Sequence, residues 1–122
     1  MAKTVLLIED EIYLNDLYKM TLEADGYTVL AAYDGEQGVE QANNHPDIIY
    51  LDIMLPKING IDVLKKLKEN DATKDIPVVI LSNLGQESIV QQALTLGAKE
   101  YVIKLQIEPA DLATKTKDLI GK

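Results

Sequence analysis

The sequence contains no cysteine among its 122 residues. Disulfide bonds, thiolate metal sites and catalysis by a thiol are therefore excluded. Long apolar runs are absent too, since no stretch approaches the ~20 residues that a membrane-spanning helix needs. The N-terminal residues lead into a strand-like run and lack the features of a signal peptide. We therefore expect a soluble cytoplasmic protein with no membrane partner.

Arginine is missing as well, because all 12 positively charged residues are lysine. A site that recognises a phosphoryl group must then use lysine, hydroxyl groups, backbone amides or a metal ion. The 20 acidic residues give a formal net charge of -8, which opposes binding to the phosphate backbone of DNA or RNA. We expect no direct nucleic-acid partner.

What the sequence does contain is a regular alternation of apolar runs and amphipathic segments. A length of 122 residues predicts a single domain, residues 1–122. Runs rich in Val, Ile and Leu predict buried strands, and apolar residues at helical spacing predict a helix after each of them. The strands are expected at 5–8, 27–32, within 46–56, at 78–81 and at 99–103. This alternation predicts an α/β, doubly wound fold with a five-stranded parallel sheet.

Two helix starts have recognisable signals. Asp34 is expected to cap a helix that runs through Val39 and Ala42, and Pro109 is expected in the first turn of the last helix. The helix that begins after Asp34 is polar, so we expect it to be the least buried.

Polar residues follow four of the five predicted strands. They are Glu9 and Asp10, Asp52, Ser82, and Lys104. In a parallel sheet the C-terminal ends of the strands share one edge, which is where open α/β sheets bind ligands. Structural ion pairs also arise in this way, but complementary groups on four strands favour a chemical site.

The charges of this group indicate a metal ion. Three carboxylates and one ammonium group at close range oppose joint ionisation, and a hard divalent cation relieves the repulsion. Mg²⁺ takes few protein carboxylates and keeps several waters, so we expect Asp10 and Asp52 as direct ligands and Glu9 acting through water. Mn²⁺ is the alternative ion. Beside such an ion, with Lys104 and Ser82 nearby, a carboxylate is equipped to accept a phosphoryl group.

Four motifs carry a resemblance to a known family. They are Leu7-Ile8-Glu9-Asp10-Glu11, Asp52-Ile53-Met54-Leu55-Pro56 with Gly60, Leu81-Ser82-Asn83, and Tyr101-Val102-Ile103-Lys104. In this order and spacing, the sequence resembles the receiver domains of two-component response regulators over essentially its whole length. The resemblance is to the chemotaxis receiver type, and it implies a flavodoxin-like (βα)5 fold with strand order 2-1-3-4-5.

The resemblance also implies roles for the site residues. Asp52 is expected to be the phosphoacceptor, which takes the phosphoryl group from a histidine kinase or a histidine phosphotransfer protein. Asp10 and Glu9 form the acidic pair, and the backbone carbonyl of Met54 is the third protein ligand of the metal beside Asp10 and Asp52. Lys104 occupies the position of the family's lysine.

A switch pair completes the implied machinery. Phosphorylation is expected to draw Ser82 toward the phosphoryl group and to let Tyr101 turn inward. The surface of the fourth helix, fifth strand and fifth helix would then change its preference for partners. The resemblance leaves open whether the target is a separate protein or a lost output domain. It is also compatible with a monomer or with a weak, phosphorylation-dependent dimer.

The sequence departs from the family pattern at two positions. Leu105 follows Lys104, where the family usually has proline across a cis bond. A cis bond before a residue other than proline costs about 2.5–4 kcal/mol, so we predict a trans bond. Glu9 replaces the commoner aspartate, and its longer side chain is expected to alter water positioning and metal affinity.

The sequence favours a signalling phosphoacceptor over three alternatives. We expect this phosphoacceptor not to be an enzyme, although it assists its own phosphorylation and dephosphorylation. An aspartyl-phosphate hydrolase would need a second acid two residues after Asp52, where Met54 stands. A nucleotide-binding protein would need a Gly-rich loop after the first strand, which is absent. A non-phosphorylated interaction module that keeps the fold stays as the alternative.

Overall fold

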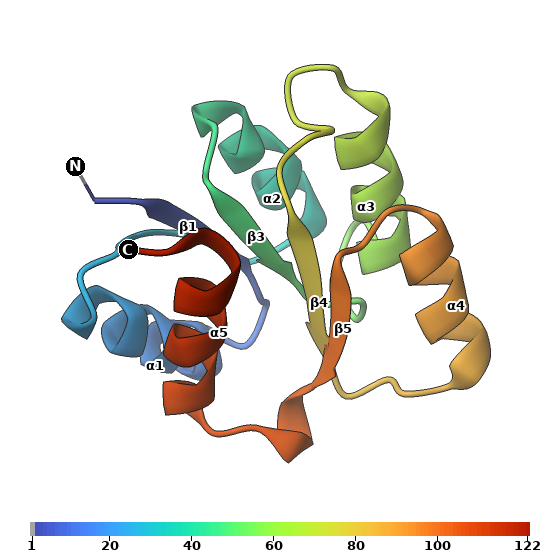
Figure 1. The fold of residues 1–122 in the computed structure, drawn as a ribbon. Coiled ribbons are helices and arrows are strands. Elements are labelled where there is room, and N and C mark those ends of the chain that lie inside the picture. The colour runs from blue at the N-terminus through green and yellow to red at the C-terminus, as the bar shows by residue number, and fades with distance from the viewer. Residues whose placement is uncertain (1) are drawn as a thin grey trace.

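The computed structural model describes residues 2–122, which alternate between strand and helix along the chain (Figure 1). The strands are β1 (Thr4–Ile8), β2 (Thr28–Ala32), β3 (Ile48–Leu51), β4 (Val78–Ser82) and β5 (Glu100–Ile103). The α-helices are α1 (Ile12–Ala24), α2 (Gly35–Gln41), α3 (Gly60–Glu69), α4 (Glu87–Thr95) and α5 (Pro109–Ile120). Short 3-10 helices, Ala42–Asn44 and Lys104–Gln106, follow α2 and β5. No helix within residues 2–122 combines the length and the apolarity that crossing a bilayer requires.

The strands form one sheet in the order β2-β1-β3-β4-β5, and every neighbouring pair is parallel. This confirms the α/β, doubly wound fold and the strand order that the resemblance implies. The order reverses beside β1, where Ile8 of β1 is in register with Leu51 of β3. Residues that follow these two strands therefore emerge next to each other at the C-terminal edge of the sheet.

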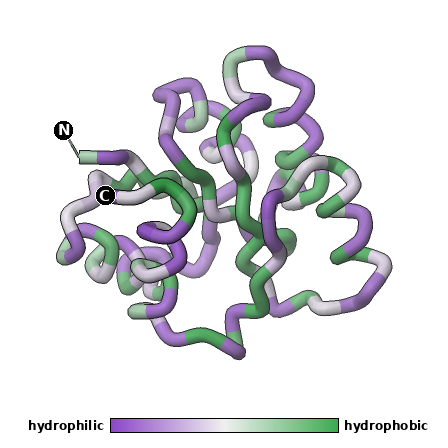
Figure 2. The backbone as a smooth tube through the Cα atoms, viewed as in Figure 1, coloured by the Kyte–Doolittle hydropathy of each residue, from purple (hydrophilic) through white to green (hydrophobic). Residues whose placement is uncertain are grey.

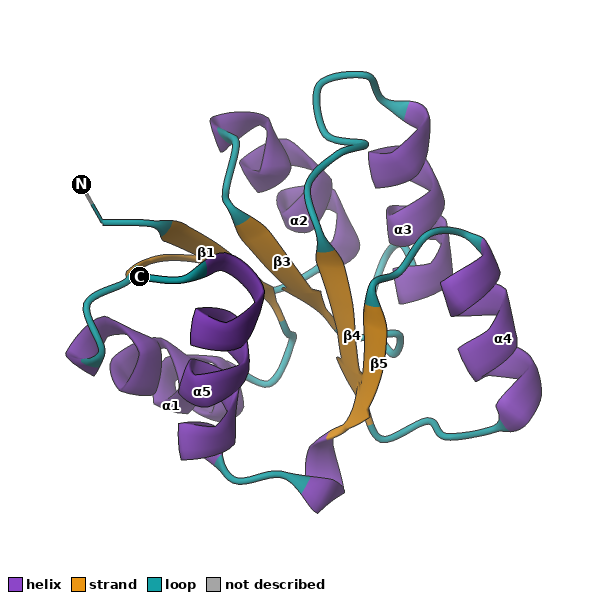
Figure 3. Ribbon diagram, in the orientation of Figure 1, coloured by secondary structure: helices purple, strands orange, loops and turns teal. Residues whose placement is uncertain are grey.

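Helices cover both faces of the sheet, with α1 and α5 on one face and α2, α3 and α4 on the other (Figures 1 and 3). Each face has its own apolar core. Tyr18 of α1 and Leu112 of α5 belong to one core, and Leu64 of α3 and Ala93 of α4 belong to the other. β3 and β4 are buried at every position, as expected for strands covered on both sides. Hydrophobic residues accordingly gather along the central strands in Figure 2.

The helix that follows Asp34 is capped as predicted, because the Asp34 side chain accepts a hydrogen bond from a backbone N–H in its first turn. The expectation that this helix, α2, is the least buried is wrong. α4 buries only Ala93, whereas the shorter α2 buries Gly35 and Gly38. A Cβ at Gly38 would lie 2.7 Å from the Ile8 side chain, so the missing Cβ lets α2 pack close to β1.

Candidate functional site

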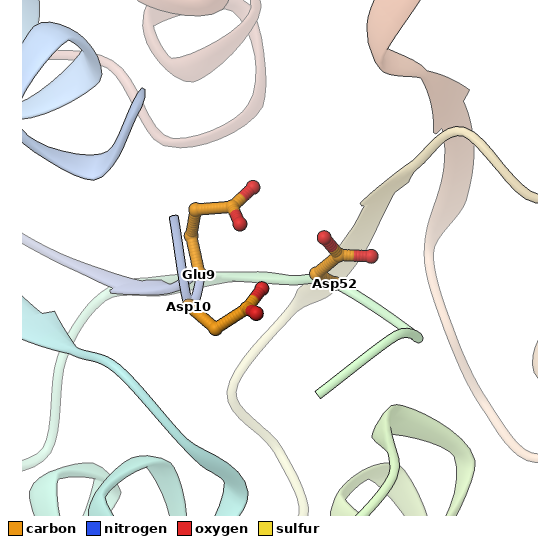
Figure 4. Close-up of side chains that lie close together, drawn as sticks. All are labelled: Glu9, Asp10 and Asp52. Carbon is orange, nitrogen blue, oxygen red and sulfur yellow. The ribbon is translucent and has the colours of Figure 1, made fainter. Parts of the chain in front are cut away.

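Three carboxylates meet at the C-terminal edge of the sheet, where β1 and β3 end. Glu9 and Asp10 come directly after β1, and Asp52 comes directly after β3. Because β1 and β3 are neighbours in the sheet, one carboxylate oxygen of each residue lies within 4.8 Å of the others. Figure 4 shows the three side chains in the space between the ends of these two strands. This spacing allows a single cation to contact more than one of them.

The carboxylates border an open pocket of about 250 Å³. Its lining residues are Glu9, Asp10, Glu11, Asp52, Met54, Asn83 and Lys104. Within residues 2–122 it contains the one cluster of at least three potential metal-ligating side chains. Carboxylate oxygens are the ligands that hard divalent cations prefer, so the residues present fit such an ion.

Both oxygens of the buried Asp52 carboxylate are held by hydrogen bonds. Oδ1 accepts from the backbone N–H of Met54 at 3.1 Å, and Oδ2 accepts from Nζ of Lys104 at 2.7 Å. The Asp52 side chain is 5% exposed, so these bonds replace most of its contact with water. The carboxylate therefore has a fixed orientation at the edge of the pocket.

The ammonium group of Lys104 forms ion pairs with two of the carboxylates. Nζ of Lys104 lies 2.6 Å from Oε1 of Glu9 and 2.7 Å from Oδ2 of Asp52. Burial alone would lower the pKa of Lys104, but the hydrogen bonds to Asp52 and Glu9 outweigh burial and raise this pKa above its ordinary value. Lys104 is thus a permanent positive charge at neutral pH. It balances one of the three carboxylates, and the charge that is left matches a divalent cation.

Glu9 is buried between Lys104 and the start of α1. Its Oε2 accepts a hydrogen bond from the backbone N–H of Glu11 at 3.1 Å. Burial raises the pKa of Glu9, and the hydrogen bonds from Lys104 and Glu11 oppose that shift. The sequence predicts that Glu9 acts on a metal through water, whereas the direct contact seen for its carboxylate is with Lys104. Asp10, the next residue, is exposed at the pocket.

Ser82 and Tyr101 meet at the loop that follows β4. Ser82 is fully buried, and its Oγ accepts a hydrogen bond from the backbone N–H of Leu84 at 3.3 Å. The Tyr101 hydroxyl donates to the carbonyl of Leu84, and the ring packs against the core under α3 and α4. Burial raises the pKa of Tyr101, which keeps its hydroxyl a donor. The Tyr101 ring is therefore partly buried, and its hydroxyl contacts the loop after β4. In the described part of the chain, the pocket lining includes Asn83 and not Ser82.

The backbone after Lys104 follows the prediction made from Leu105. No peptide bond among residues 2–122 is cis, so the Lys104–Leu105 bond is trans. The backbone N–H of Leu105 donates to Oδ1 of Asn83 at 3.0 Å. The sequence did not single out Asn83 as a site residue beyond its place in a motif. Its position one residue after a strand was the available signal.

Asn15 is a second residue that the sequence did not single out. It is fully buried on α1, and its Nδ2 donates to the carbonyls of Glu9 at 3.1 Å and Ala32 at 3.2 Å. These bonds tie the end of β1 to the end of β2 and fix the backbone that carries the acidic pair. An amide on the apolar face of a helix was the only signal, and this pattern is not specific.

Comparison with known proteins assigns this arrangement to a family. A family model described as "Response regulator receiver domain" matches residues 5–117. The chain belongs to that family. The receiver domain is 37% identical to the phosphate regulon transcriptional regulatory protein PhoB of Escherichia coli, over 100% of this chain and 53% of PhoB. It therefore spans about half the length of that relative.

Solved structures are similar to the whole receiver domain. The CheY-like response regulator receiver domain protein of Methanospirillum hungatei JF-1 has a TM-score of 0.91 at 25% identity, over 98% of this chain and 94% of that one. A chain of the CheX-CheY-BeF₃-Mg²⁺ complex of Borrelia burgdorferi has a TM-score of 0.86 at 30% identity, over 98% of this chain and 90% of that one. The resemblance that the four motifs indicated is thus confirmed.

Proposed function

We propose that this receiver domain accepts a phosphoryl group on Asp52 from a phosphohistidine of a histidine kinase or a histidine phosphotransfer protein. The observation that carries the proposal is the position of the Asp52 carboxylate. It is oriented by two hydrogen bonds, lies beside Glu9 and Asp10, and borders an open pocket. A carboxylate in this position is a nucleophile with a cationic group already in place for the transferring oxygens.

The chain's own residues have defined tasks in the transfer step. A carboxylate oxygen of Asp52 forms a bond to phosphorus, and the bond between phosphorus and the histidine nitrogen breaks. The electron pair of the broken bond stays on the imidazole, which takes up a proton from solvent. The Met54 N–H keeps the carboxylate oriented, while Lys104 offers its ammonium group to the phosphoryl oxygens. The products are an aspartyl phosphate and a neutral imidazole.

We propose Mg²⁺ as the ion of the acidic cluster, with Mn²⁺ as the alternative. Asp10, Asp52 and the backbone carbonyl of Met54 would be its protein ligands, and Glu9 would act through water. When bound, such an ion offsets negative charge on the phosphoryl oxygens. The structure from Borrelia burgdorferi, in which the related chain was solved with BeF₃ and Mg²⁺, supports this choice.

Phosphorylation would be transmitted to a target by a change in the surface that binds partners. Ser82 would hydrogen-bond the phosphoryl group, and Tyr101 would hold the loop after β4 through its hydroxyl. The surface formed by α4, β5 and α5 would then favour a different partner. PhoB is a transcriptional regulatory protein, so an output domain on a longer chain is one candidate target and a separate protein is the other.

We infer further that the domain acts in the cytoplasm as a phosphoacceptor rather than as an enzyme, although it assists its own phosphorylation and dephosphorylation. A net charge of -8 favours protein partners over direct contact with nucleic acid. The domain would act as a monomer or as a weak dimer that forms on phosphorylation.

Intact-mass measurement after treatment with acetyl phosphate and Mg²⁺ tests the proposal. The native chain is expected to gain the mass of one phosphoryl group, and Asp52→Asn is expected to gain none. Asp71→Asn is the control, because the Asp71 side chain is 95% exposed and should label normally. Equal gains in the native chain and in Asp52→Asn would exclude Asp52 as the acceptor. No gain in the native chain would instead favour a non-phosphorylated interaction module.

A further inference from the structure

The contact between β4 and β5 continues beyond the end of their hydrogen-bonded ladder. Ser82 and Ile103 form the last register pair of these two strands. Asn83 and Lys104 are the next residues, and both line the pocket. One residue further on, the backbone N–H of Leu105 donates to Oδ1 of Asn83 at 3.0 Å. The Asn83 side chain thus makes the next hydrogen bond between the two segments after the backbone ladder ends.

This hydrogen bond holds a turn whose middle residues, Leu105 and Gln106, are exposed. The Leu105 side chain is 84% exposed, so it does not anchor the backbone in the core. The 3-10 helix Lys104–Gln106 is a single turn, closed by a long hydrogen bond of 3.3 Å from Ile107 N–H to the Lys104 carbonyl. The Asn83 side chain therefore supplies the tie between this turn and the loop after β4.

Lys104 depends on that tie for the direction of its side chain. Its ammonium group must meet Glu9 and Asp52 at 2.6 and 2.7 Å at the same time. Four rotatable bonds separate the ammonium group from the backbone, so the side chain has many alternative conformations, and a fixed backbone limits those available to it while Nζ contacts both carboxylates. The ladder fixes the residue before Lys104, and Asn83 fixes the residue after it.

We propose that Asn83 is a positioning residue for Lys104. By accepting the Leu105 N–H, Asn83 fixes the backbone that aims the ammonium group between Glu9 and Asp52. It also couples this group to the loop that follows Ser82. The proposal rests on the function proposed for Asp52, and it requires an N–H at position 105, which proline would not have.

Phosphorylation rates measure the effect in the 122-residue chain. With phosphoramidate and Mg²⁺, Asn83→Ala is expected to slow phosphorylation of Asp52 about tenfold, because the lysine loses its fixed direction. In a Lys104→Met background the same substitution is expected to cause no further loss, since a residue that acts through Lys104 cannot matter without it. Leu105→Ala is the control: it keeps the N–H and removes only an exposed side chain, so it should react like the native chain.

A second readout does not depend on phosphorylation. In protein labelled with ¹⁵N-lysine, an ammonium group held by two buried carboxylates should exchange its protons slowly and give a sharp NMR signal. Lys104→Met identifies that signal by removing it. Asn83→Ala is expected to broaden or abolish the signal, and Leu105→Ala is expected to preserve it.

The outcomes separate the two proposals. If the native chain is not phosphorylated, the function proposed for Asp52 fails, and the ammonium signal alone decides the role of Asn83. An unchanged ammonium signal in Asn83→Ala would overturn the positioning role. So would an equal slowing by Asn83→Ala in the native and Lys104→Met backgrounds, because the effect would then not pass through the lysine.

Discussion

Oε1 of Glu9 and Nζ of Lys104 are joined by a 2.6 Å ion pair, although 95 residues separate them in the sequence. The same ammonium group also contacts Asp52, so one lysine pairs with two acids that follow different strands. All three side chains are at most 10% exposed. Breaking an ion pair in such surroundings is expensive, because the charge left behind has lost both its partner and its water.

Replacing Lys104 with methionine should therefore reduce stability. Lys104→Met keeps an unbranched side chain and removes the charge, which leaves Glu9 and Asp52 as buried carboxylates without a cation. We expect the free energy of unfolding to fall by about 3 kcal/mol in EDTA. Mg²⁺ should restore part of the loss, since it supplies positive charge to the same acids. Urea unfolding with and without Mg²⁺ measures both values.

Lys115→Met is the matched control for this substitution. Lys115 pairs with Glu100 at 2.7 Å, but the two side chains are 28% and 37% exposed. Solvent screens such a pair, so the loss should stay below about 1 kcal/mol and should not respond to Mg²⁺. A Lys104→Met variant that is as stable as the native chain in EDTA would contradict the importance given to the buried pair.

Mg²⁺ should raise the thermal stability of the native chain, and the increase should depend on Asp10. An ion at about 100 times its Kd stabilises the folded state by about 2.7 kcal/mol. Asp10→Asn removes a proposed ligand, so we expect it to lose most of the Mg²⁺-dependent shift in Tm. Its Tm in EDTA should equal or exceed that of the native chain, because repulsion among the acids falls. Asp16→Asn, at an exposed position on α1, is the control, and an equal Mg²⁺ shift in Asp10→Asn would exclude Asp10 as a ligand.

The acidic cluster could be predicted because a parallel sheet assembles it. Glu9, Asp10 and Asp52 each follow a strand within two residues, so finding the strands places the acids on one edge. The alternation of elements predicted the sheet, but it did not define which strands are neighbours. That order came from the family resemblance, and it is what brings the ends of β1 and β3 together.

Contacts between side chains and distant backbone could not be predicted in this way. Asn83 accepts a hydrogen bond from the Leu105 N–H. Asn15 donates to the carbonyls of Glu9 and Ala32. These pairings depend on where loops meet in space. The prediction that α2 is the least buried helix is wrong for a related reason. Its polar composition suggested an exposed helix, whereas its glycines allow the close packing that the structure shows.

The stability of the protein at alkaline pH should depend on Tyr50, whose hydroxyl is buried in the core. Its hydroxyl is buried 2.7 Å from the hydroxyl of Thr116, and burial raises the pKa of Tyr50 well above its ordinary value of 10.0. The unfolded chain then loses this proton first, so the native protein loses stability as the pH rises above about 10. Tyr50→Phe has no such proton. Thr116 stays satisfied in the variant, because it donates to the Leu112 carbonyl at 2.7 Å.

Urea unfolding at several pH values measures the effect. At neutral pH the native chain should be more stable than Tyr50→Phe by about 1 kcal/mol, the net value of a hydrogen bond. This difference should shrink, and then change sign, as the pH rises above about 10. Tyr13→Phe serves as control, because Tyr13 is 84% exposed. A difference between the native chain and Tyr50→Phe that does not change with pH would show that the Tyr50 hydroxyl ionises as easily as in the unfolded chain.

Gly60, at the start of α3, holds the loop that carries Asp52 in place by leaving room for it. A Cβ at Gly60 would lie 2.2 Å from the Asp52 carbonyl oxygen and 2.4 Å from Cα of Ile53. Both are backbone atoms, so Gly60→Ala must displace the loop itself. We expect the free energy of unfolding to fall by about 3 kcal/mol and phosphorylation of Asp52 to slow at least about tenfold.

Gly85→Ala separates this effect from the general cost of replacing a glycine. A Cβ at Gly85 would meet only the end of the Ile103 side chain, at 3.2 Å, and that side chain can rotate away. The loss of stability should then stay below about 1 kcal/mol. Urea unfolding and the phosphorylation rate compare the two variants. If Gly60→Ala behaves like Gly85→Ala in both measurements, the start of α3 does not constrain the position of Asp52.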